Sequence, residues 1–330
     1  MHVDSRPPAR VRAGGTVLSL LAAPLIVPIL RAHVEGPLRL PDLRERIGGA
    51  AQTTLRGQVG KLRDIGALER EVQAGVMPYT VVNEITPAGM GVLAVAELVE
   101  AWLARAPQGP IPLGSEPAKG AIRSLVGGWG STILRALAAE PCSLTELDSA
   151  IPDLSYPALE RRLSGMRAAR QVEARPSAVG TAKPYAVTEW TRQAVGPLVA
   201  AGRCECQHFS EDAEPLTSVD VEAAFLLAVP LVEAESSHTG SCLFAVDTDD
   251  QEEDEPSNRL AGVHVEVENG YVASCISKIE QNPQAWALGA VESWVEAILD
   301  GRIESLRLGG HDQDFVQGLI EGLHGALAGD

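Results

Sequence analysis

The chain has 330 residues, of which 45% are hydrophobic and only 4% aromatic, so it can form two or three globular domains with mainly aliphatic cores. No stretch holds the roughly 18–20 unbroken apolar residues of a membrane span, and five cysteines argue for a reducing cytoplasm rather than a disulfide framework. The net charge of −17 is uneven, because residues 1–110 and 111–208 each carry +2 whereas residues 209–330 carry −21. We therefore expect a cytoplasmic protein with a mildly basic first part and a strongly acidic last third.

One apolar pattern occurs twice, about 104 residues apart. Ile29-Leu30-Arg31-Ala32 corresponds to Ile133-Leu134-Arg135-Ala136. The same offset relates Pro37, Leu40, Leu43, Ile47, Leu55 and Leu62 to Pro141, Leu144, Leu147, Ile151, Leu159 and Met166. A matched apolar framework at a fixed offset indicates two copies of one small domain. Because the polar residues between these positions differ, the copies are expected to share a fold but need not share a surface.

Three helices, a two-stranded hairpin and a closing helix are predicted for the first copy. The helices are expected at 17–34, 40–47 and about 51–64, the strands at 68–72 and 79–82, and the closing helix from Thr86-Pro87 to about Ala104. With three arginines ahead of it, the apolar run 17–30 also imitates a signal peptide, but it fits the first helix of the repeat better. This order of elements is that of a winged helix-turn-helix domain.

The second copy follows the same order. Helices are expected at 131–139 and 144–150, Ser155 caps a third helix with Pro157 in its first turn, and a hairpin spans about 171–188 with its tip at 176–180. Four prolines between 106 and 117 indicate a linker between the copies. The predicted organisation is a first winged helix-turn-helix domain at 1–105, a Pro-rich linker at 106–118, and a second winged helix-turn-helix domain at 119–203.

The acidic last third is predicted to be a separate α+β domain at 216–330, after a linker at 204–215. Apolar runs at 223–233 and 241–246 are typical of strands, and alternating residues at 263–267 and 271–276 flank Asn269-Gly270, a strong hairpin signal. Two amphipathic helices are expected at 285–300 and 313–328, with a short strand at 305–308 between them. The whole chain is thus predicted to be mainly α with small β wings, as two tandem winged helix-turn-helix domains plus a C-terminal α+β domain.

Two clusters of possible metal ligands do not support a metal site. Cys204-x-Cys206-x-His208 offers three ligands where a closed zinc site usually has four, so we favour a solvated linker that holds two thiols by chance. The acidic run 247–255 has seven carboxylates but lacks the turn glycine of a calcium loop, which favours a solvated, mobile loop. We expect no metal and no cofactor.

Catalytic motifs are also missing from the sequence. It has no Gly-x-Ser-x-Gly, no phosphate-cradling glycine loop and no His-Glu-x-x-His, and its seven histidines are scattered. An enzyme is therefore the least favoured functional class, and no catalytic residues are assigned.

A set of short motifs recurs in order in both copies. In the first copy these are Ile29-Leu30-Arg31-Ala32, Gly36-Pro37-Leu38-Arg39-Leu40-Pro41-Asp42-Leu43, Gln52, Leu55, Leu62, Gly66, Leu68-Glu69-Arg70-Glu71, Pro78, Tyr79 and Thr86-Pro87-Ala88-Gly89. In the second they are Gly128-Trp129, Ile133-Leu134-Arg135, Leu144-Thr145-Glu146-Leu147, Leu159, Arg162-Leu163, Val172, Glu173, Pro184 and Tyr185. Roughly residues 15–105 and 120–200 thereby resemble the HxlR-type winged-helix transcriptional regulators. The second copy departs from the family at Val187-Thr188-Glu189-Trp190, where Thr-Pro-x-Gly is usual.

The resemblance implies binding to double-stranded DNA. The family usually has one such domain per chain and dimerises, so two copies in one chain look like a built-in, asymmetric dimer; whether the whole chain forms a homodimer is left open. A winged helix places its third helix in the major groove and its hairpin near the phosphates or the minor groove. The candidate DNA contacts are Gln52, Thr53, Arg56, Lys61 and Arg63 in the first copy, and Ser155, Tyr156, Arg161, Arg162 and Arg167, with Arg175 and Lys183 in the wing, in the second.

A solvated helix face would carry the same kinds of residue, because surface arginine and lysine need no special explanation. Their clustering on the third helix of both copies favours DNA contact. Gly57 and Gly60 weaken the first copy's helix by roughly 1 kcal/mol each relative to alanine. Either the second copy is the stronger DNA-reading domain, or DNA orders the helix of the first.

The last third shows a second, looser similarity. Its hairpin, Ala285-Trp286-Ala287, Trp294, Leu299-Asp300-Gly301-Arg302 and Leu308-Gly309-Gly310 resemble a sterol-carrier-protein type domain, a family that folds helices onto a sheet around an apolar tunnel. The resemblance implies a small apolar ligand. The candidate ligand-binding residues are Phe225, Leu227, Phe244, Val265, Trp286, Trp294 and Leu323. Apolar stripes of this kind more often mean core packing.

These patterns favour a DNA-binding transcriptional regulator, with a repressor as the hypothesis, whose acidic C-terminal domain senses a small apolar ligand. The alternative is a lipid or small-molecule carrier whose winged helices serve as protein-interaction modules. The basic third helices argue against the alternative. A domain of charge −21 should also repel the DNA backbone and so suppress non-specific binding.

Overall fold

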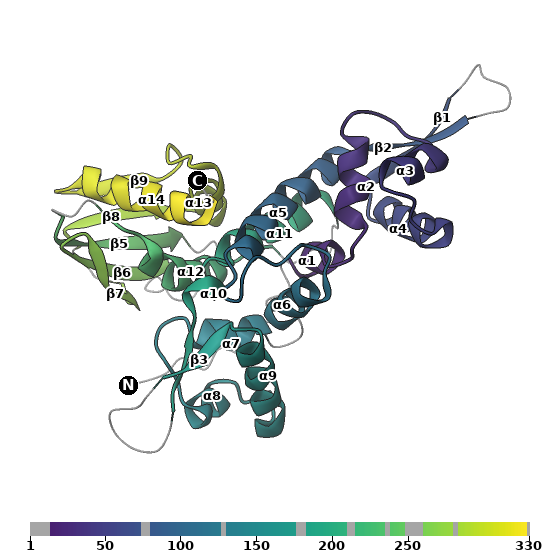
Figure 1. Cartoon of the computed structure of the whole chain (residues 1–330). Helices are drawn as coiled ribbons and strands as arrows, with labels where there is room; N and C mark the ends of the chain where they lie inside the picture. Colours follow the sequence, from purple (N-terminus) through teal and green to yellow (C-terminus); the bar gives the residue numbers. More distant parts are fainter. Residues whose placement is uncertain are drawn as a thin grey trace. The chain divides into compact units, whose positions relative to one another are not determined.

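The computed structural model describes residues 14–73, 80–126, 130–175, 183–209, 215–234, 238–247, 260–279 and 283–328 (Figure 1). These residues form a mixed α and β structure with one five-stranded sheet and two two-stranded sheets. They divide into two compact units. The first unit holds residues 13–123 and 200–215, and the second unit holds 124–199 and 216–330. The boundaries between the units fall inside two helices, α6 (Glu116–Val126) and α11 (Val195–His208).

The first unit contains five helices ahead of α6 and one hairpin. They are α1 (Gly15–Leu21), α2 (Ile26–His33), α3 (Leu40–Arg46), α4 (Gln52–Asp64), β1 (Leu68–Gln73), β2 (Thr80–Ile85) and α5 (Pro87–Ala104). Every element from α3 to α5 was predicted to within a few residues. The tip of this hairpin, with Pro78 and Tyr79, lies outside the described residues.

The single helix predicted at 17–34 is wrong. The chain forms α1 and α2 instead, with a 90° bend between them. Pro24 lies in the break, where it has no N–H to donate and disfavours the helical conformation of the residue before it. Pro28 is tolerated because it lies in the first turn of α2, where its N–H would have no partner inside the helix.

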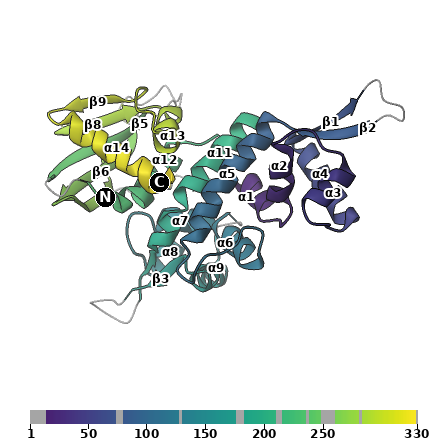
Figure 2. The same cartoon turned by 45° about the horizontal axis from the view of Figure 1, so that its top comes forward.

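The end of α11 completes the first unit and lies beside α5 (Figure 2). A Cβ at Gly91 of α5 would lie 3.1 Å from Cys204 Sγ, so the two helices approach closely. Glu205, the next residue of α11, is 7% exposed and accepts hydrogen bonds from the backbone N–H groups of Gly14 (2.9 Å) and Val17 (2.6 Å). Its carboxylate therefore caps the start of α1, because it accepts from N–H groups that have no partner inside the helix. Burial raises the pKa of Glu205, while these backbone hydrogen bonds oppose the increase.

The second copy of the repeat belongs to the second unit. Its elements are α7 (Gly130–Ala136), α8 (Leu144–Ala150), α9 (Tyr156–Ala168), β3 (Val172–Ala174), β4 (Tyr185–Val187) and α10 (Glu189–Arg192). Ser155 is the N-cap residue of α9 and Pro157 lies in its first turn, as predicted, although the Ser155 hydroxyl makes no capping hydrogen bond. The predicted hairpin tip at 176–180 lies outside the described residues.

Equivalent hydrogen bonds relate the two copies. After the second strand of each, a threonine caps the next helix: Thr86 accepts from Gly89 N and Thr188 from Thr191 N. Each threonine hydroxyl also donates to a backbone carbonyl just after α4 or α9. Thr86 donates to the Gly66 oxygen at 2.6 Å, and Thr188 donates to the Arg170 oxygen at 2.9 Å. Gly66 and Arg170 both have positive φ, 74° and 61°. The repeated sequence pattern therefore has a repeated backbone geometry, although Arg170 adopts it at a conformational cost.

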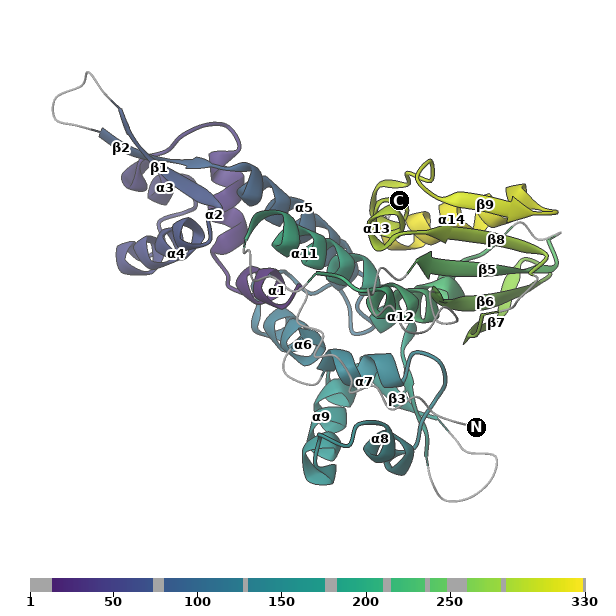
Figure 3. The same cartoon turned by 180° about the vertical axis from the view of Figure 1, so that it is seen from behind.

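The acidic last third forms a five-stranded sheet with helices on one face (Figure 3). In the order β7-β6-β5-β8-β9, the strands are β7 (Tyr271–Ser277), β6 (Leu260–Glu268), β5 (Gly240–Asp247), β8 (Ala285–Gly289) and β9 (Arg307–Gly310). The helices are α12 (Ser218–Ala228), α13 (Val291–Asp300) and α14 (Gln313–Ala328), with a short 3₁₀ turn at Val229–Leu231. The predicted hairpin is confirmed: Asn269 (φ 51°) and Gly270 (φ 83°) make the turn between β6 and β7.

Two predictions in this domain are wrong. The apolar run 223–233 is not a strand, because α12 runs through Ala228, with Thr217 and Asp220 forming a capping box at its start. The helix predicted at 285–300 is half strand, since 285–289 form β8 and only 291–300 form α13. Trp286 and Trp294 therefore do not share one helical stripe. The short strand lies at 307–310, two residues beyond its predicted start.

One helix in the described part of the chain, α5, is long and apolar enough to cross a membrane, and the bent pair α1 and α2 would count as a second if it were one span. Half of α5 is buried inside the first unit. Its buried residues include Val92, Val95, Ala96 and Val99, as expected for a helix in the core of a domain.

Candidate nucleic-acid interface and regulatory domain

Helices α4 and α9 have the same amphipathic construction. Leu55, Val59 and Leu62 on α4, and Leu159, Leu163 and Met166 on α9, are buried at matching i, i+4, i+7 positions. All twelve candidate DNA contacts are exposed: Gln52, Thr53, Arg56, Lys61 and Arg63 on α4, and Ser155, Tyr156, Arg161, Arg162, Arg167, Arg175 and Lys183 in the second copy. The buried stripe therefore fixes each helix to its own domain while the polar face remains available for a partner.

The cations on these two faces have no intramolecular partner among the described residues. Arg56, Lys61 and Arg63 on α4, and Arg161, Arg162 and Arg167 on α9, form no ion pair there. Some other exposed arginines do pair, namely Arg39 with Asp42 at 2.6 Å and Arg46 with Glu35 at 2.5 Å, whereas Arg70 and Arg105 are exposed and form no ion pair among the described residues. In the wing, Arg175 pairs with Glu173 at 3.4 Å. Each of the two helices thus presents three positive charges that the fold does not neutralise.

Three mid-helix glycines on these faces have no packing role within the protein. A Cβ at Gly57, Gly60 or Gly165 would meet no atom within 4 Å. By contrast, a Cβ at Gly89 would lie 2.3 Å from the Ala67 carbonyl oxygen, so that glycine is required by packing. Each unrequired helical glycine costs roughly 1 kcal/mol relative to alanine. Close approach of an external molecule would give these glycines a function.

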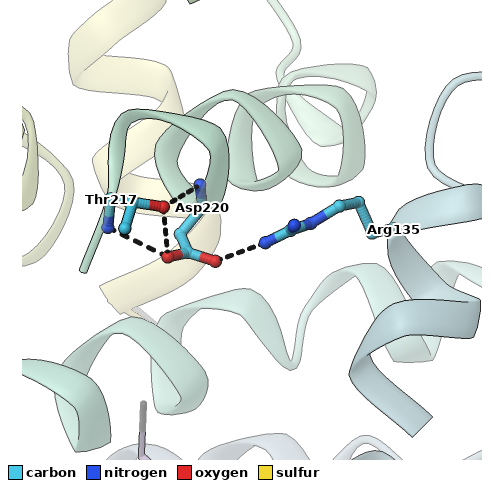
Figure 4. A network of polar contacts seen from close by, with 3 residues as sticks. All are labelled: Arg135, Thr217 and Asp220. Carbon is cyan, nitrogen blue, oxygen red and sulfur yellow. Dashed lines mark hydrogen bonds and ion pairs between the residues drawn. The ribbon is translucent and has the colours of Figure 1, made fainter. Parts of the chain in front are cut away.

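Arginines of the second copy hold α12, the first helix of the acidic domain, at both ends. Figure 4 shows Arg135 of α7 beside the capping box of α12, with 2.6 Å between Arg135 Nη2 and Asp220 Oδ1. The other oxygen of Asp220 accepts from the N–H (2.9 Å) and the hydroxyl (2.7 Å) of Thr217. At the opposite end, Arg192 of α10 donates to the carbonyl oxygens of Leu226 and Leu227, both at 2.9 Å.

Both contacts suit the charge distribution of a helix, with the carboxylate at its N-terminus and a cation at its C-terminus. The Arg135 and Asp220 side chains are only 19% and 15% exposed. Burial lowers the pKa of Arg192, but two carbonyl acceptors satisfy the guanidinium. A displacement of α12 would therefore break or strain its hydrogen bonds with Arg135 of α7 and Arg192 of α10.

Arg135→Ala is expected to destabilise the second unit by about 1–3 kcal/mol, because Asp220 would lose a partly buried cation. Arg31→Ala is the matched control. Arg31 occupies the equivalent position of the first copy and pairs with Glu100 at 2.5 Å, but those side chains are 51% and 35% exposed, so a loss below about 1 kcal/mol is expected. Amide hydrogen exchange along α12 measures the first effect, and urea unfolding measures both. An equal loss of unfolding free energy in the two variants would contradict the conclusion that the ion pair of Arg135 with Asp220 stabilises the second unit more than that of Arg31 with Glu100 stabilises the first.

The candidate ligand-binding residues do not all come together. Phe225, Phe244 and Trp294 form an aromatic cluster with ring centroids 4.6–5.5 Å apart, and the Trp294 indole N–H donates to the Ala245 carbonyl oxygen at 2.8 Å. Three other candidates, Leu227, Val265 and Leu323, are also buried. Side chains of the domain therefore fill this core themselves.

Trp286 lies on the other face of the sheet. In the register, Ala287 of β8 is opposite Phe244 and Trp286 is opposite Leu243, so the two neighbours on β8 point to different faces. Trp286 is half-buried, and its ring covers Gly309 of β9, where a Cβ would lie 2.2 Å from the indole. Of the seven candidate ligand-binding residues, Trp286 is the one that a ligand could reach without opening the core.

Three of the five cysteines, Cys204, Cys242 and Cys275, are poor metal ligands and nucleophiles because burial disfavours their thiolates. All five are free. Burial raises the pKa of Cys204 to about 11 and those of Cys242 and Cys275 to about 12, which keeps the thiols protonated. Within the described residues, no three His, Cys, Asp or Glu side chains are grouped to hold a metal ion. The solvated linker predicted at 204–215 is wrong for residues 204–208, because these residues end α11 and Cys204 is buried. Most of the acidic run 247–255 lies outside the described residues.

Three residues of structural importance could not be identified from the sequence. Arg135 and Arg31 occupy the same framework position, yet only Arg135 is drawn into a partly buried ion pair. Arg192 and Glu205 act on backbone groups of distant segments, which no local pattern indicates. Comparison with known proteins gives no further indication: no family model matches the chain, and no curated protein matches it.

Proposed function

We propose that the chain is a DNA-binding transcriptional regulator, acting as a repressor, in which α4 and α9 are the DNA-reading helices of two winged helix-turn-helix domains. The observation that carries the proposal is that two helices with matching buried stripes each expose three cations that form no ion pair among the described residues. Unpaired arginine and lysine are the groups that neutralise phosphates and bind guanine in the major groove. The resemblance of both copies to HxlR-type regulators supports the same function.

The glycines of α4 provide a test that separates DNA contact from a merely solvated face. Gly57→Ala together with Gly60→Ala should stabilise the first unit by about 1–2 kcal/mol, because alanine is the better helix former and both sites are open. If DNA approaches this face closely, the added methyl groups should weaken binding several-fold at the same time. Urea unfolding and fluorescence anisotropy with operator DNA measure the two effects.

Gly120→Ala is the matched control, since Gly120 is also helical and a Cβ at this position would meet no atom within 4 Å. It should stabilise its helix without changing DNA affinity. A gain in stability at Gly57 and Gly60 with unchanged DNA affinity would remove α4 from the interface.

The acidic domain is the regulatory part in this proposal, and α12 is its connection to the second DNA-reading domain. The ligand is a small apolar molecule that contacts Trp286. Its binding would shift the equilibrium between DNA-competent and DNA-incompetent states by its difference in affinity for the two states. The contacts of Arg135 and Arg192 with the ends of α12 support such a coupling.

Tryptophan fluorescence tests the ligand proposal. A panel of lipids and aromatic metabolites should contain at least one compound that changes the emission of the full chain, and Trp286→Phe should abolish that change. Trp102→Phe is the control, because Trp102 is buried in the first unit. A chain that ignores the whole panel would count against ligand sensing.

A further inference from the structure

Structurally equivalent positions of α4 and α9 differ in chemistry. With an offset of 104 residues, Gln52, Thr53 and Arg56 of α4 correspond to Tyr156, Pro157 and Glu160 of α9. All six are exposed. These positions lie in the first turns of their helices, the part of a helix-turn-helix reading helix that contacts base edges.

The centres of the two outward faces also differ. Opposite the buried stripe, α9 presents Arg161 and α4 presents Gly57. Arg161 is exposed and has no ion-pair partner among the described residues. Only Arg63 and Arg167, nearer the C-terminal ends, keep the same basic side chain in both helices. A symmetric pair of half-sites cannot suit both faces equally.

We infer that the two helices read different half-sites, a G·C-specified one under α9 and an A·T-specified one under α4, so that the operator is not a palindrome. Arginine binds the O6 and N7 acceptors of guanine, and a glutamate accepts from the N4 amino group of cytosine. Arg161 and Glu160 together therefore favour G·C pairs. Glutamine binds N6 and N7 of adenine, and the threonine methyl contacts that of thymine, so Gln52 and Thr53 favour A·T pairs. Arg56, one turn further along α4, is assigned in this inference to a phosphate rather than to a base.

This inference rests on the proposed function and deepens it by naming the substrate. The asymmetry also gives a reason for two copies in one chain, since a homodimer of a single domain would impose a two-fold symmetric site. Two different reading helices in one chain supply a recognition element for each half of an asymmetric site.

Selection from a random-duplex library with the full chain tests the inference. The wild-type protein should enrich a site with one G·C-rich and one A·T-rich half and no two-fold symmetry. Arg161→Ala should reduce the preference for guanine at its position from about tenfold or more to near onefold, in the G·C half alone. Arg161→Lys should keep the affinity better and retain part of the preference for guanine, because the lysine ammonium can still donate to O6 and N7 but lacks the planar fork of arginine.

Gln52→Ala is the reciprocal variant and should relax only the A·T half. Both residues are exposed and outside the buried stripes, so neither variant should alter folding. Enrichment of a palindrome or of two equal repeats would overturn the inference and leave DNA binding established. Relaxation of both halves by Arg161→Ala would overturn it as well. A selection that enriches no sequence would overturn the proposed function together with the inference.

Discussion

Replacing Arg161 and Arg162 by alanine should weaken operator binding by about 100-fold, because each arginine contributes roughly 1–3 kcal/mol when it contacts a base or phosphate. Both side chains are exposed on α9 and unpaired among the described residues, so their loss should not change the stability of the domain. The salt dependence of binding should also flatten by about one unit for each lost phosphate contact. Titrations of labelled operator at several salt concentrations measure both effects.

Arg302→Ala with Arg307→Ala is the charge-matched control. Both arginines are exposed in the acidic domain, so this double variant removes the same charge away from the proposed interface. Its operator affinity should stay within about twofold of the wild type, since neither arginine lies on α4 or α9 and Arg307 already pairs with Asp247 at 3.8 Å. Unchanged affinity and salt slope in the Arg161 and Arg162 variant would exclude α9 from the interface.

Glu205→Ala should destabilise the first unit by about 3 kcal/mol. The substitution removes a buried carboxylate that accepts from the N–H groups of Gly14 and Val17, and it leaves those donors without a protein partner. Hydrogen exchange of the α1 amides measures the loss directly. Glu97→Ala is the control, because Glu97 is exposed on α5 in the same unit and should change stability by less than about 0.5 kcal/mol.

The pH dependence of the Glu205 contribution has an unusual sign for a carboxyl group. Burial raises its pKa in the folded state above the ordinary value for a glutamate, so between the unfolded and folded pKa values the folded protein binds more protons. Stability therefore falls as the pH rises through that window and is level above it. Glu205→Gln should lose this dependence. A Glu205→Ala variant as stable as Glu97→Ala, or a wild-type protein without the fall, would contradict the role assigned to this carboxylate.

Local patterns in the sequence were sufficient where one face of an element meets the core and the other meets water. The helices α4, α5 and α14 and the hairpin of β6 and β7 follow from periodicity, caps and the Asn269-Gly270 turn. All twelve candidate DNA contacts are exposed for the same reason. That they contact DNA stays a prediction.

Periodicity failed where an element is buried on more than one side. The apolar run after Val221 was compatible with a strand or a buried helix, and the capping box of Thr217 and Asp220 was the signal that could have decided for α12. Trp286, Ala290 and Trp294 share a helical spacing by coincidence, because Ala290 is the N-cap of α13 and Trp286 belongs to β8. Sequence spacing therefore predicted that Trp286 and Trp294 lie on one helix face, whereas in the structure they lie on opposite sides of the sheet.

Contacts between distant segments were beyond the reach of sequence patterns. The ion pair of Arg135 with Asp220 spans 85 residues, and the hydrogen bond from Gly14 to Glu205 spans 191. Such contacts depend on how the helices pack, and the residues that form them look like ordinary surface charges in the sequence. The pair of Arg135 with Asp220 nevertheless joins α12 of the acidic domain to the second copy, and the bond from Gly14 to Glu205 joins α1 to α11.

We propose that the chain binds a specific duplex through its two exposed cationic helices. Fluorescence anisotropy of the purified full chain tests it most directly, with its own upstream DNA and a random duplex of equal length at two salt concentrations. We expect the upstream DNA to bind about 1,000-fold or more tightly than the random duplex, with binding that persists at the higher salt. Equal, salt-sensitive binding to both duplexes, or binding to neither, would contradict the claim, and the second result would favour a carrier protein.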